Sequence, residues 1–251
     1  MLGHTTVWQC STKSCKLQFA EPQLDDVALA NAYSRLYYPN VESGSPSICE
    51  NTSKSILVQL FKKITKRLGN SDGRTCLDYG CGKGNLGVVA REFGWIPKGV
   101  EADPQGCEEA LRNLGAGVYR NLDDLLQAEP SARFDLITLW QVIEHLRTPW
   151  LDLERLRPLL KLGGIVVIST PNADGLRAHM LRRRSECYQN VTHFYYFGPS
   201  SMMAVLHRSG FSRFERWHDE TFYEHHGFIR STVQKALVAF RLNGELLFEA
   251  S

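Results

Sequence analysis

A glycine-rich segment after an apolar run contains the residues best suited to bind a ligand. It reads Asp78-Tyr79-Gly80-Cys81-Gly82-Lys83-Gly84, and Gly87 follows soon after. Glycines let the backbone turn tightly and approach a ligand without a Cβ in the way. A helix that begins after such a loop points its first amide groups at the ligand. The segment therefore predicts a ligand-binding turn between a strand and a helix.

Two classes of cofactor use such a loop. Gly82, Gly84 and Gly87 satisfy the G-x-G-x-x-G pattern of dinucleotide-binding proteins, which predicts a nicotinamide-dependent oxidoreductase. Gly80, Gly82 and Gly84 instead form G-x-G-x-G with an acidic residue, Asp78, two positions upstream. A carboxylate disfavours a pyrophosphate, but it attracts the ammonium group of S-adenosylmethionine (SAM). Asp78 therefore favours SAM over a dinucleotide.

Acidic residues also follow the next two expected strands. Glu101-Ala102 comes about 20 residues after the loop, where an acid accepts hydrogen bonds from ribose hydroxyls. Leu122-Asp123 follows the third expected strand, where a polar side chain could bind the adenine amino group. Asp123 could equally be the N-cap of a helix over 124–128. Together with the loop, these positions predict a cofactor that carries adenosine.

The elements that must position these residues alternate between short apolar runs and helical stretches. The expected strands are 75–79, 97–101, 117–120, 134–140 and 165–169, and the expected helices are 86–93, 104–114 and 148–160, with a kink or early end at Pro158. Such alternation predicts a parallel sheet covered on both faces. Further strands are expected at 211–217 and 245–250, the last antiparallel at the sheet edge. We therefore predict an α/β, Rossmann-like, doubly wound sheet of seven mostly parallel strands.

Before the glycine loop, the pattern predicts an N-terminal helical arm. A helix is expected over 22–38, a loop over 39–52, and then an amphipathic helix with Ser53 as N-cap. We expect residues 1–52 to form an arm, acting as a lid or as the remnant of a zinc module, and residues 53–251 to form the main domain. Near the end of the chain, 232–242 is expected to be helical.

Four segments in order make the chain resemble class I SAM-dependent methyltransferases. Asp78–Gly84 resembles their first motif, 134–146 their fourth strand and the turn after it, and 160–172 their fifth-strand segment. The stretch 193–197, which leads into Gly210-Phe211, is similar to the branch that contains ubiquinone-biosynthesis O-methyltransferases. The resemblance implies methyl transfer from SAM to a small molecule, with oxygen the favoured acceptor. A protein that binds SAM without catalysis is a further alternative.

The resemblance also implies roles for individual residues. Asp78, Gly80 and Gly82 would hold the methionine part, Glu101 the ribose, and Leu122-Asp123 the adenine, while Trp140-Gln141 would lie beside the sulfonium. Tyr79, Ala102 and His145 complete the expected cofactor-binding set.

A histidine and a possible metal motif bear on the acceptor. His193 is the first candidate for a general base, although it could instead order its loop, and His225 and His226 are weaker candidates. In the ubiquinone-type enzymes, a Glu-x-x-Glu-His pattern is associated with a divalent metal. Here Gln141 replaces the first glutamate, which weakens a site for a hard cation. We expect no metal, and we interpret Glu144-His145 as structural or cofactor-adjacent.

Composition excludes several other classes of function. The net charge is 29 − 27 = +2, so nucleic acid and membrane partners are not expected, and the run Arg182–Arg184 is interpreted as a solvated face. No apolar stretch reaches the ~20 residues that span a bilayer, and no signal peptide is visible at the N-terminus. The seven cysteines are therefore expected to be reduced in the cytoplasm.

Cys10 and Cys15 resemble the tail of the zinc module with which some relatives begin. Trp8-Gln9 and the segment 16–19 complete that likeness. Tetrahedral zinc needs four ligands, and His4 is the only further candidate nearby. We therefore expect no zinc at this pair.

Overall fold

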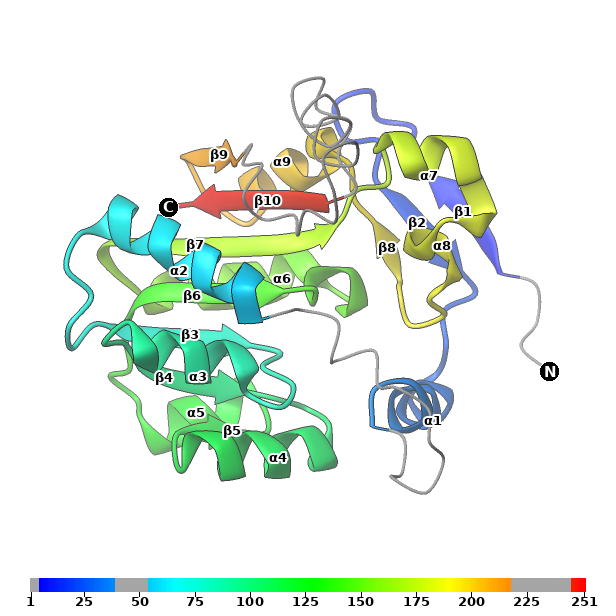
Figure 1. The fold of residues 1–251 in the computed structure, drawn as a ribbon. Coiled ribbons are helices and arrows are strands. Elements are labelled where there is room, and N and C mark those ends of the chain that lie inside the picture. Colours follow the sequence, from blue (N-terminus) through cyan, green and yellow to red (C-terminus); the bar gives the residue numbers. More distant parts are fainter. Residues whose placement is uncertain (1–4, 39–53, 218–244) are drawn as a thin grey trace.

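The computed structural model describes residues 5–38, 54–217 and 245–251 (Figure 1). At its centre is a seven-stranded sheet with the order β5-β4-β3-β6-β7-β10-β9. Its strands are β3 (Thr75–Tyr79), β4 (Ile96–Val100), β5 (Val118–Tyr119), β6 (Phe134–Trp140), β7 (Leu160–Pro171), β9 (Phe214–Arg216) and β10 (Glu245–Ala250). Strands β3 to β7 pair in parallel, and β10 is antiparallel to both of its neighbours. The predicted Rossmann-like sheet with an antiparallel last strand is confirmed, but the expected edge position of that strand was wrong, because β9 pairs with the outer side of β10.

Helices cover both faces of this sheet, as Figure 1 shows. One layer contains α2 (Lys54–Leu68), α3 (Asn85–Glu92) and α4 (Pro104–Leu114), and the other contains α5 (Leu122–Ala128), α6 (Pro149–Leu156) and α9 (Pro199–Arg208). Alternate strand residues face the two layers, since Cys76 packs with α2 and α3 while the adjacent Leu77 packs with α5 and α6. This alternation follows from the two-residue period of a strand.

One helix end agrees with the sequence pattern, and one helix start does not. Helix α6 ends at Leu156, and the 3₁₀ helix Arg157–Leu159 contains Pro158, so the early end expected there is confirmed. Asp123 is not an N-cap, because Asn121 caps α5 by accepting from the backbone N–H of Asp124 at 2.8 Å. That alternative for Asp123 was wrong: the helix starts two residues earlier than expected.

The N-terminal arm is not only helical. It contains a hairpin, β1 (Thr6–Gln9) and β2 (Gln18–Glu21), followed by α1 (Asp26–Leu36) with Asp25 as N-cap. Strand β2 also pairs with β8 (Tyr195–Tyr196), which makes a second, three-stranded sheet. The sequence pattern missed this hairpin because both strands are only four residues long and β1 is exposed on both faces.

The segment between β7 and β8 is also more regular than expected. It forms α7 (Leu176–Leu181), a 3₁₀ turn (Arg182–Arg184) and α8 (Glu186–Gln189). Arg182 and Arg184 are exposed, in line with the solvated face predicted for this run. The expected loop over 39–52, the Ser53 cap, the helix over 232–242, His225 and His226 lie outside the described residues.

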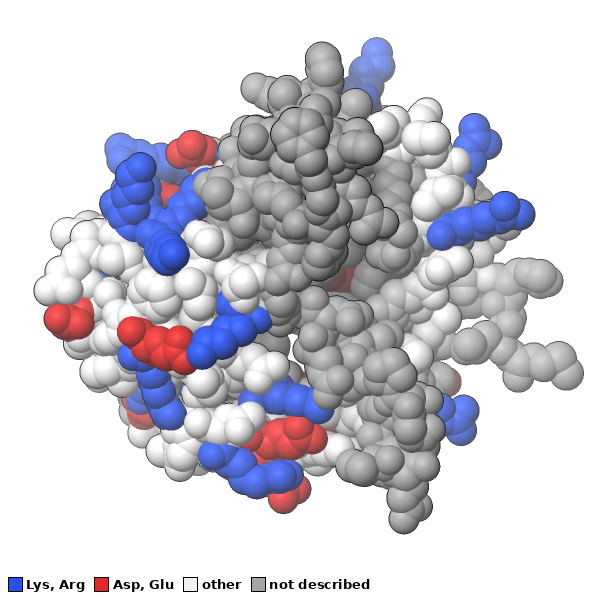
Figure 2. Space-filling model, viewed as in Figure 1, with Lys and Arg blue, Asp and Glu red and all other residues white. Residues whose placement is uncertain are grey.

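Charges of both signs share the molecular surface. Figure 2 shows Lys and Arg side chains interspersed with Asp and Glu side chains on the described part of one face. Ion pairs include Lys54 of α2 with Glu92 of α3 at 2.6 Å and Lys83 of the glycine loop with Glu109 of α4 at 3.3 Å. Among the described helices, none is long and apolar enough to cross a membrane.

Candidate active site

The glycine loop lies where β3 ends and α3 begins. Gly80, Gly82 and Gly84 have φ values of +81°, +54° and +80°, a region that favours glycine. A Cβ on Gly80 would lie 2.5 Å from a methyl group of Val142. The loop therefore packs directly against the turn that follows β6. Gly87 has an ordinary φ and is needed for packing, because a Cβ there would lie 2.9 Å from Leu114.

Asp78 is a buried carboxylate at the end of β3. It is 4% exposed, and its Oδ1 accepts a hydrogen bond of 2.7 Å from the Thr138 hydroxyl. Burial raises the pKa of Asp78 to about 7, and the nearby negative charge of Glu101 acts in the same direction, whereas the hydrogen bond from Thr138 opposes it. A cation placed beside this carboxylate would hold it ionised.

Glu101 connects the next strand to the glycine loop. Its Oε2 accepts from the backbone N–H of Gly82 at 2.8 Å, and its Oε1 accepts from that of Asp103 at 2.9 Å. Burial raises its pKa, and the two backbone donors oppose that shift. Two predicted residues, Gly82 and Glu101, are thus joined directly. Ala102 follows, and its carbonyl accepts from Arg120 at 2.9 Å.

Tyr38 is a buried aromatic residue at the same place. Its ring reaches from the end of α1 to α4, where its Cζ lies 2.7 Å from the position of a Cβ on Gly106. The Cγ of Glu101 lies 3.0 Å from that position, and the Tyr38 hydroxyl lies 3.8 Å from where Gly82 would have a Cβ.

The residues after β5 are arranged at the start of α5. Leu122 is buried, whereas Asp123 is exposed and its carboxylate pairs with Arg155 of α6. Tyr79 also turns toward α6, because its hydroxyl donates to Asp152 Oδ1 at 2.7 Å. The Tyr79 side chain therefore anchors the end of β3, and the backbone of this residue remains part of the loop.

The turn after β6 contributes three further predicted positions. Trp140 ends the strand, and Gln141 has a φ of +57°, while its Nε2 donates to Ser169 Oγ at 2.8 Å. Glu144 is 1% exposed, and its Oε2 accepts from the Thr170 hydroxyl at 2.9 Å. The Nδ1 of His145 lies 3.0 Å from the carbonyl of Thr192.

His193 packs directly against His145. The two rings meet edge to face with their centroids 4.7 Å apart. The Nδ1 of His193 lies 2.9 Å from the carbonyl of Cys187. Burial lowers the pKa of His193 to about 4 and that of His145 to about 3, so both rings are neutral at pH 7. Because a carbonyl only accepts, each Nδ1 carries the proton and each Nε2 keeps its lone pair.

Helix α1 covers this pair of histidines. The rings of Tyr33 and Tyr37 each lie 6.0 Å from that of His145. The Tyr37 hydroxyl accepts from Asn190 Nδ2 at 2.7 Å and lies 3.3 Å from the Thr192 hydroxyl. One helix thus reaches the glycine loop through Tyr38 and the histidines through Tyr33 and Tyr37.

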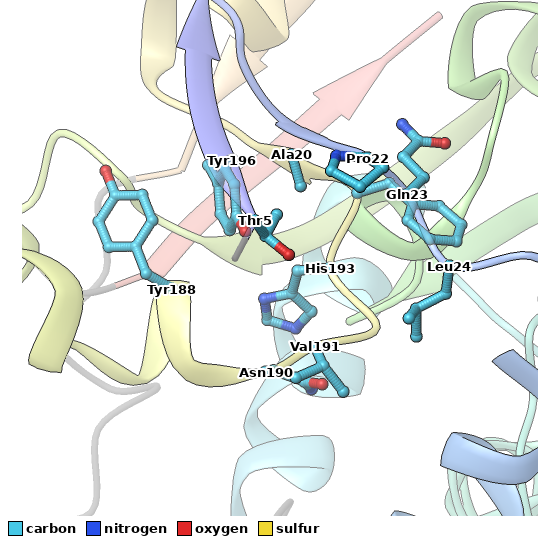
Figure 3. Close-up of a pocket in the computed structure, with 11 residues that line it drawn as sticks. Thr5, Ala20, Pro22, Gln23, Leu24, Tyr188, Asn190, Val191, His193 and Tyr196 are labelled. Atoms are coloured by element: carbon cyan, nitrogen blue, oxygen red, sulfur yellow. The ribbon is translucent and has the colours of Figure 1, made fainter. Parts of the chain in front are cut away.

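A cavity of about 150 Å³ adjoins His193. Figure 3 shows His193 surrounded by side chains of the N-terminal arm and of the stretch before β8. Its lining residues are Thr5, Ala20, Pro22, Gln23, Leu24, Tyr188, Asn190, Val191, His193, Phe194 and Tyr196. The missed hairpin therefore forms one wall of a cavity next to the predicted base.

The possible ligand atoms near the turn after β6 indicate which kind of metal ion this part of the structure suits. Glu144, His145 and His193 each offer a ligand atom, and these atoms lie within 4.8 Å of one another. Magnesium prefers several oxygen ligands, and this set supplies only the carboxylate of Glu144 beside two imidazoles. Zinc, iron and nickel accept imidazole readily. The residues therefore fit a transition metal and not magnesium.

The sequence comparisons agree with one another. Residues 54–215 match the model of a family described as a methyltransferase domain. The ubiquinone biosynthesis O-methyltransferase of Paraburkholderia phytofirmans is 33% identical over 105 residues, which are 40% of this chain and 45% of that protein. The protein of the same name from Leptothrix cholodnii is 32% identical over 115 residues, 43% and 49% of the two chains. The match thus spans less than half of these curated relatives.

Solved structures show the same fold. A SAM-dependent methyltransferase from Archaeoglobus fulgidus superposes with a TM-score of 0.56 at 18% identity, over 78% of this chain and 92% of that one. A plantazolicin methyltransferase, solved with a desmethyl analogue and SAH, gives a TM-score of 0.61 at 14% identity, over 88% and 94%. At these identities, the likeness concerns the fold alone.

Proposed function

Since this chain belongs to the methyltransferase domain family, we propose that it transfers the methyl group of SAM to an oxygen atom of a small molecule. The observation that carries the proposal is a pair of carboxylates, the buried Asp78 and the partly buried Glu101, on either side of a loop of left-handed glycines. A buried carboxylate needs a compensating partner, and the ammonium group of SAM is a suitable one for Asp78.

The cofactor supplies an electrophilic methyl group, and the chain's own residues bind and orient it. Asp78 would accept from the ammonium group, and the loop glycines leave room for the methionine part. Glu101 would accept from the ribose hydroxyls in addition to its backbone donors. Tyr38 would close over the ribose, since it lies against Glu101 and Gly106. Leu122 and Asp123 remain the proposed adenine contacts.

The acceptor is proposed to bind beside the two histidines. The likeness to ubiquinone biosynthesis O-methyltransferases supports an oxygen acceptor. The Nε2 of His193 has a lone pair that can accept a hydroxyl proton, and the carbonyl of Cys187 fixes the orientation of the ring. Holding the acceptor oxygen in line with the methyl group contributes up to ~7–11 kcal/mol to lowering the barrier.

We propose that residues 1–52 act as a lid over a methyltransferase domain formed by residues 53–251. Support comes from α1, which contacts both the cofactor loop and the histidines, and from the hairpin that holds the arm on β8. The described cysteines are free thiols, which fits the proposed cytoplasmic location.

Calorimetry with SAM tests the cofactor site. We expect Asp78→Ala and Glu101→Ala each to weaken SAM binding by about tenfold or more, which corresponds to ~1.4 kcal/mol. Glu108→Ala is the matched control, because Glu108 is an exposed carboxylate that pairs only with Arg112 on its own helix among the described ion pairs. Undiminished SAM binding by both site variants, or tight NADH binding without SAM binding, would overturn the proposal.

A methyl-transfer screen tests the acceptor. Phenols, carboxylic acids and amines of low mass would be incubated with the full chain and SAM, and SAH release would be measured. Turnover confined to hydroxyl or carboxyl compounds supports an oxygen acceptor. Turnover only with amines contradicts it, and SAM binding without turnover on any of these compounds favours the non-catalytic alternative.

A further inference from the structure

We propose that Glu144, His145 and His193 form a binding site for one transition-metal ion, with His193 in place of the carboxylate that is absent at position 141. The histidine-rich ligand set would select Zn²⁺ or Co²⁺ over Mg²⁺. The inference relies on the proposed function only for what the ion does to the acceptor. Metal binding itself can be measured without SAM and without an acceptor.

The three side chains converge from separate parts of the chain. Glu144 and His145 come from the turn after β6, and His193 comes from the stretch just before β8. One ligand atom from each lies within 4.8 Å of the others, and Nε2 of His145 is 3.9 Å from Oε1 of Glu144. Metal–ligand bonds are about 2.0–2.2 Å long, so small side-chain rotations would bring all three atoms onto one ion.

Each of the three side chains is held by a hydrogen bond of the kind that orients metal ligands. A ligating histidine generally donates its second ring N–H to a carbonyl or carboxylate, which fixes its tautomer. His145 does so to Thr192 at 3.0 Å and His193 to Cys187 at 2.9 Å. Glu144 is held by the Thr170 hydroxyl at 2.9 Å. Two imidazole Nε2 atoms and the Glu144 carboxylate thus lie close together.

Gln141 stands where the ubiquinone-type pattern has a glutamate, so the proposed ligand set contains one carboxylate beside two imidazoles. Its amide donates to Ser169 Oγ at 2.8 Å, so this side chain is bound to β7. A glutamate at this position would add a charged oxygen, the ligand that magnesium prefers. With one carboxylate and two imidazoles, the set instead suits zinc, cobalt, nickel or iron.

The cavity described above adjoins one of the three proposed ligands, His193. It holds about 150 Å³ and is lined by residues of the arm and of α8. A bound ion polarises an oxygen ligand and lowers the pKa of its proton. With the ion bound, the Nε2 lone pair of His193 belongs to the metal and this ring no longer acts as the base. An acceptor hydroxyl bound to the ion would then release its proton to water more readily.

Titration of the metal-free chain tests the site. After chelator treatment, the protein would be titrated with ZnCl₂, CoCl₂ and MgCl₂ by calorimetry, and the Co²⁺ complex recorded by visible absorption. We expect one equivalent of Zn²⁺ and Co²⁺ to bind, at least about 100-fold more tightly than Mg²⁺. His193→Gln and Glu144→Gln should each weaken Zn²⁺ binding by about 10–100-fold, the range seen when metal-site contacts are lost.

Three variants separate this site from others. His207→Gln, an exposed histidine, should leave Zn²⁺ affinity unchanged. A Cys10→Ser/Cys15→Ser chain should also keep the site, and its Co²⁺ spectrum should lack thiolate charge-transfer bands. Gln141→Glu should raise Mg²⁺ affinity by about tenfold or more, because it adds a hard oxygen ligand. This gain cannot arise from misfolding.

The proposal is overturned if neither Zn²⁺ nor Co²⁺ binds, or if binding disappears only in the cysteine variant. It is also overturned if His193→Gln and Glu144→Gln, shown to be folded by circular dichroism, bind Zn²⁺ like the wild type. SAM calorimetry on the same preparations separates this failure from failure of the proposed function. Normal SAM binding would then leave His193 acting as a base without a metal.

Discussion

Asp78 is a carboxylate whose burial is compensated by a hydroxyl donor, Thr138. Its pKa is raised to about 7, so protonated and ionised forms are both present in the free protein at neutral pH. SAM carries an ammonium group and a sulfonium, and such a ligand favours the ionised form. At the scale of single residues, the affinity for SAM is therefore coupled to the proton on Asp78.

The coupling predicts pH-dependent binding. Below pH 7, SAM must displace the proton from Asp78, so its dissociation constant should rise by up to about tenfold per pH unit as the pH falls. Above pH 8, the affinity should be constant. Calorimetry from pH 5.5 to 8.5, in buffers with different ionisation enthalpies, measures both the affinity and the protons released. Asp78→Asn should bind weakly at every pH, and a flat wild-type profile would contradict this prediction.

The raised pKa of Asp78 also predicts how the stability of the ligand-free protein changes with pH. The folded-state pKa of about 7 lies above the ordinary value of 3.8, so ionised Asp78 destabilises the free protein. This penalty is absent below pH 3.8, grows as the pH rises, and is complete above pH 7. Asp78→Asn should therefore melt at a higher temperature than the wild type at pH 8, with a smaller difference at pH 5. Differential scanning calorimetry checks this, and an equal difference at both pH values would exclude it.

At the scale of elements, Tyr38, which follows the end of α1, packs closely against α4. Gly106 lies inside α4, and Tyr38 occupies the space that a Cβ on Gly106 would need. Alanine normally stabilises a helix by about 1 kcal/mol relative to glycine. A glycine at this position therefore sacrifices helix stability and leaves room for the tyrosine.

Gly106→Ala should consequently displace Tyr38 from the cofactor site. We expect SAM affinity to fall by about tenfold, or ~1.4 kcal/mol, while thermal stability does not fall. Calorimetry on Gly106→Ala, Tyr38→Ala and the double variant gives the coupling between the two positions. If Tyr38 acts as proposed, the alanine at position 106 should have little further effect once Tyr38 is removed. Additive losses would mean that the effect of Gly106 does not act through Tyr38.

At the scale of the whole molecule, β10 inserts residues 245–250 into the sheet between β7 and the edge strand β9. It pairs with β7 over six residues, from Glu245 opposite Pro171 to Ala250 opposite Val166, and with β9 on its other side. Its Phe248 is among the largest fully buried side chains and belongs to the main core cluster, which also contains residues of α5, α6 and α9. The stability of the sheet therefore depends on the last seven residues.

Truncating the Phe248 side chain should strongly lower the stability of the protein. Phe248→Ala is expected to lower the free energy of unfolding by about 3–5 kcal/mol through lost burial and the cavity it leaves. Leu162→Ala is the control, because Leu162 is fully exposed and should change stability by less than about 0.5 kcal/mol. Urea unfolding followed by circular dichroism measures both, and equal midpoints would show that β10 is not part of the cooperative core.

The sequence by itself determined the elements whose signals are local. Strand–helix alternation predicted the parallel sheet, and Asp78 and Glu101 followed from their spacing around a glycine loop. Such features depend on neighbouring residues, so periodicity and turn chemistry suffice to find them. The roles of the individual site residues remain proposals.

Only the tertiary structure decided which distant residues meet. Thr138 bonds Asp78 from 60 positions away, Tyr38 reaches Gly106 from the arm, and His193 packs on His145 across 48 positions (193 − 145). The pairing of β2 with β8 joins residues 18–19 to 195–196. No local pattern encodes these contacts, because they arise when chain segments that carry no mutual signal pack on the same sheet edge. The glycine loop could therefore be found in the sequence, but the partners around it could not.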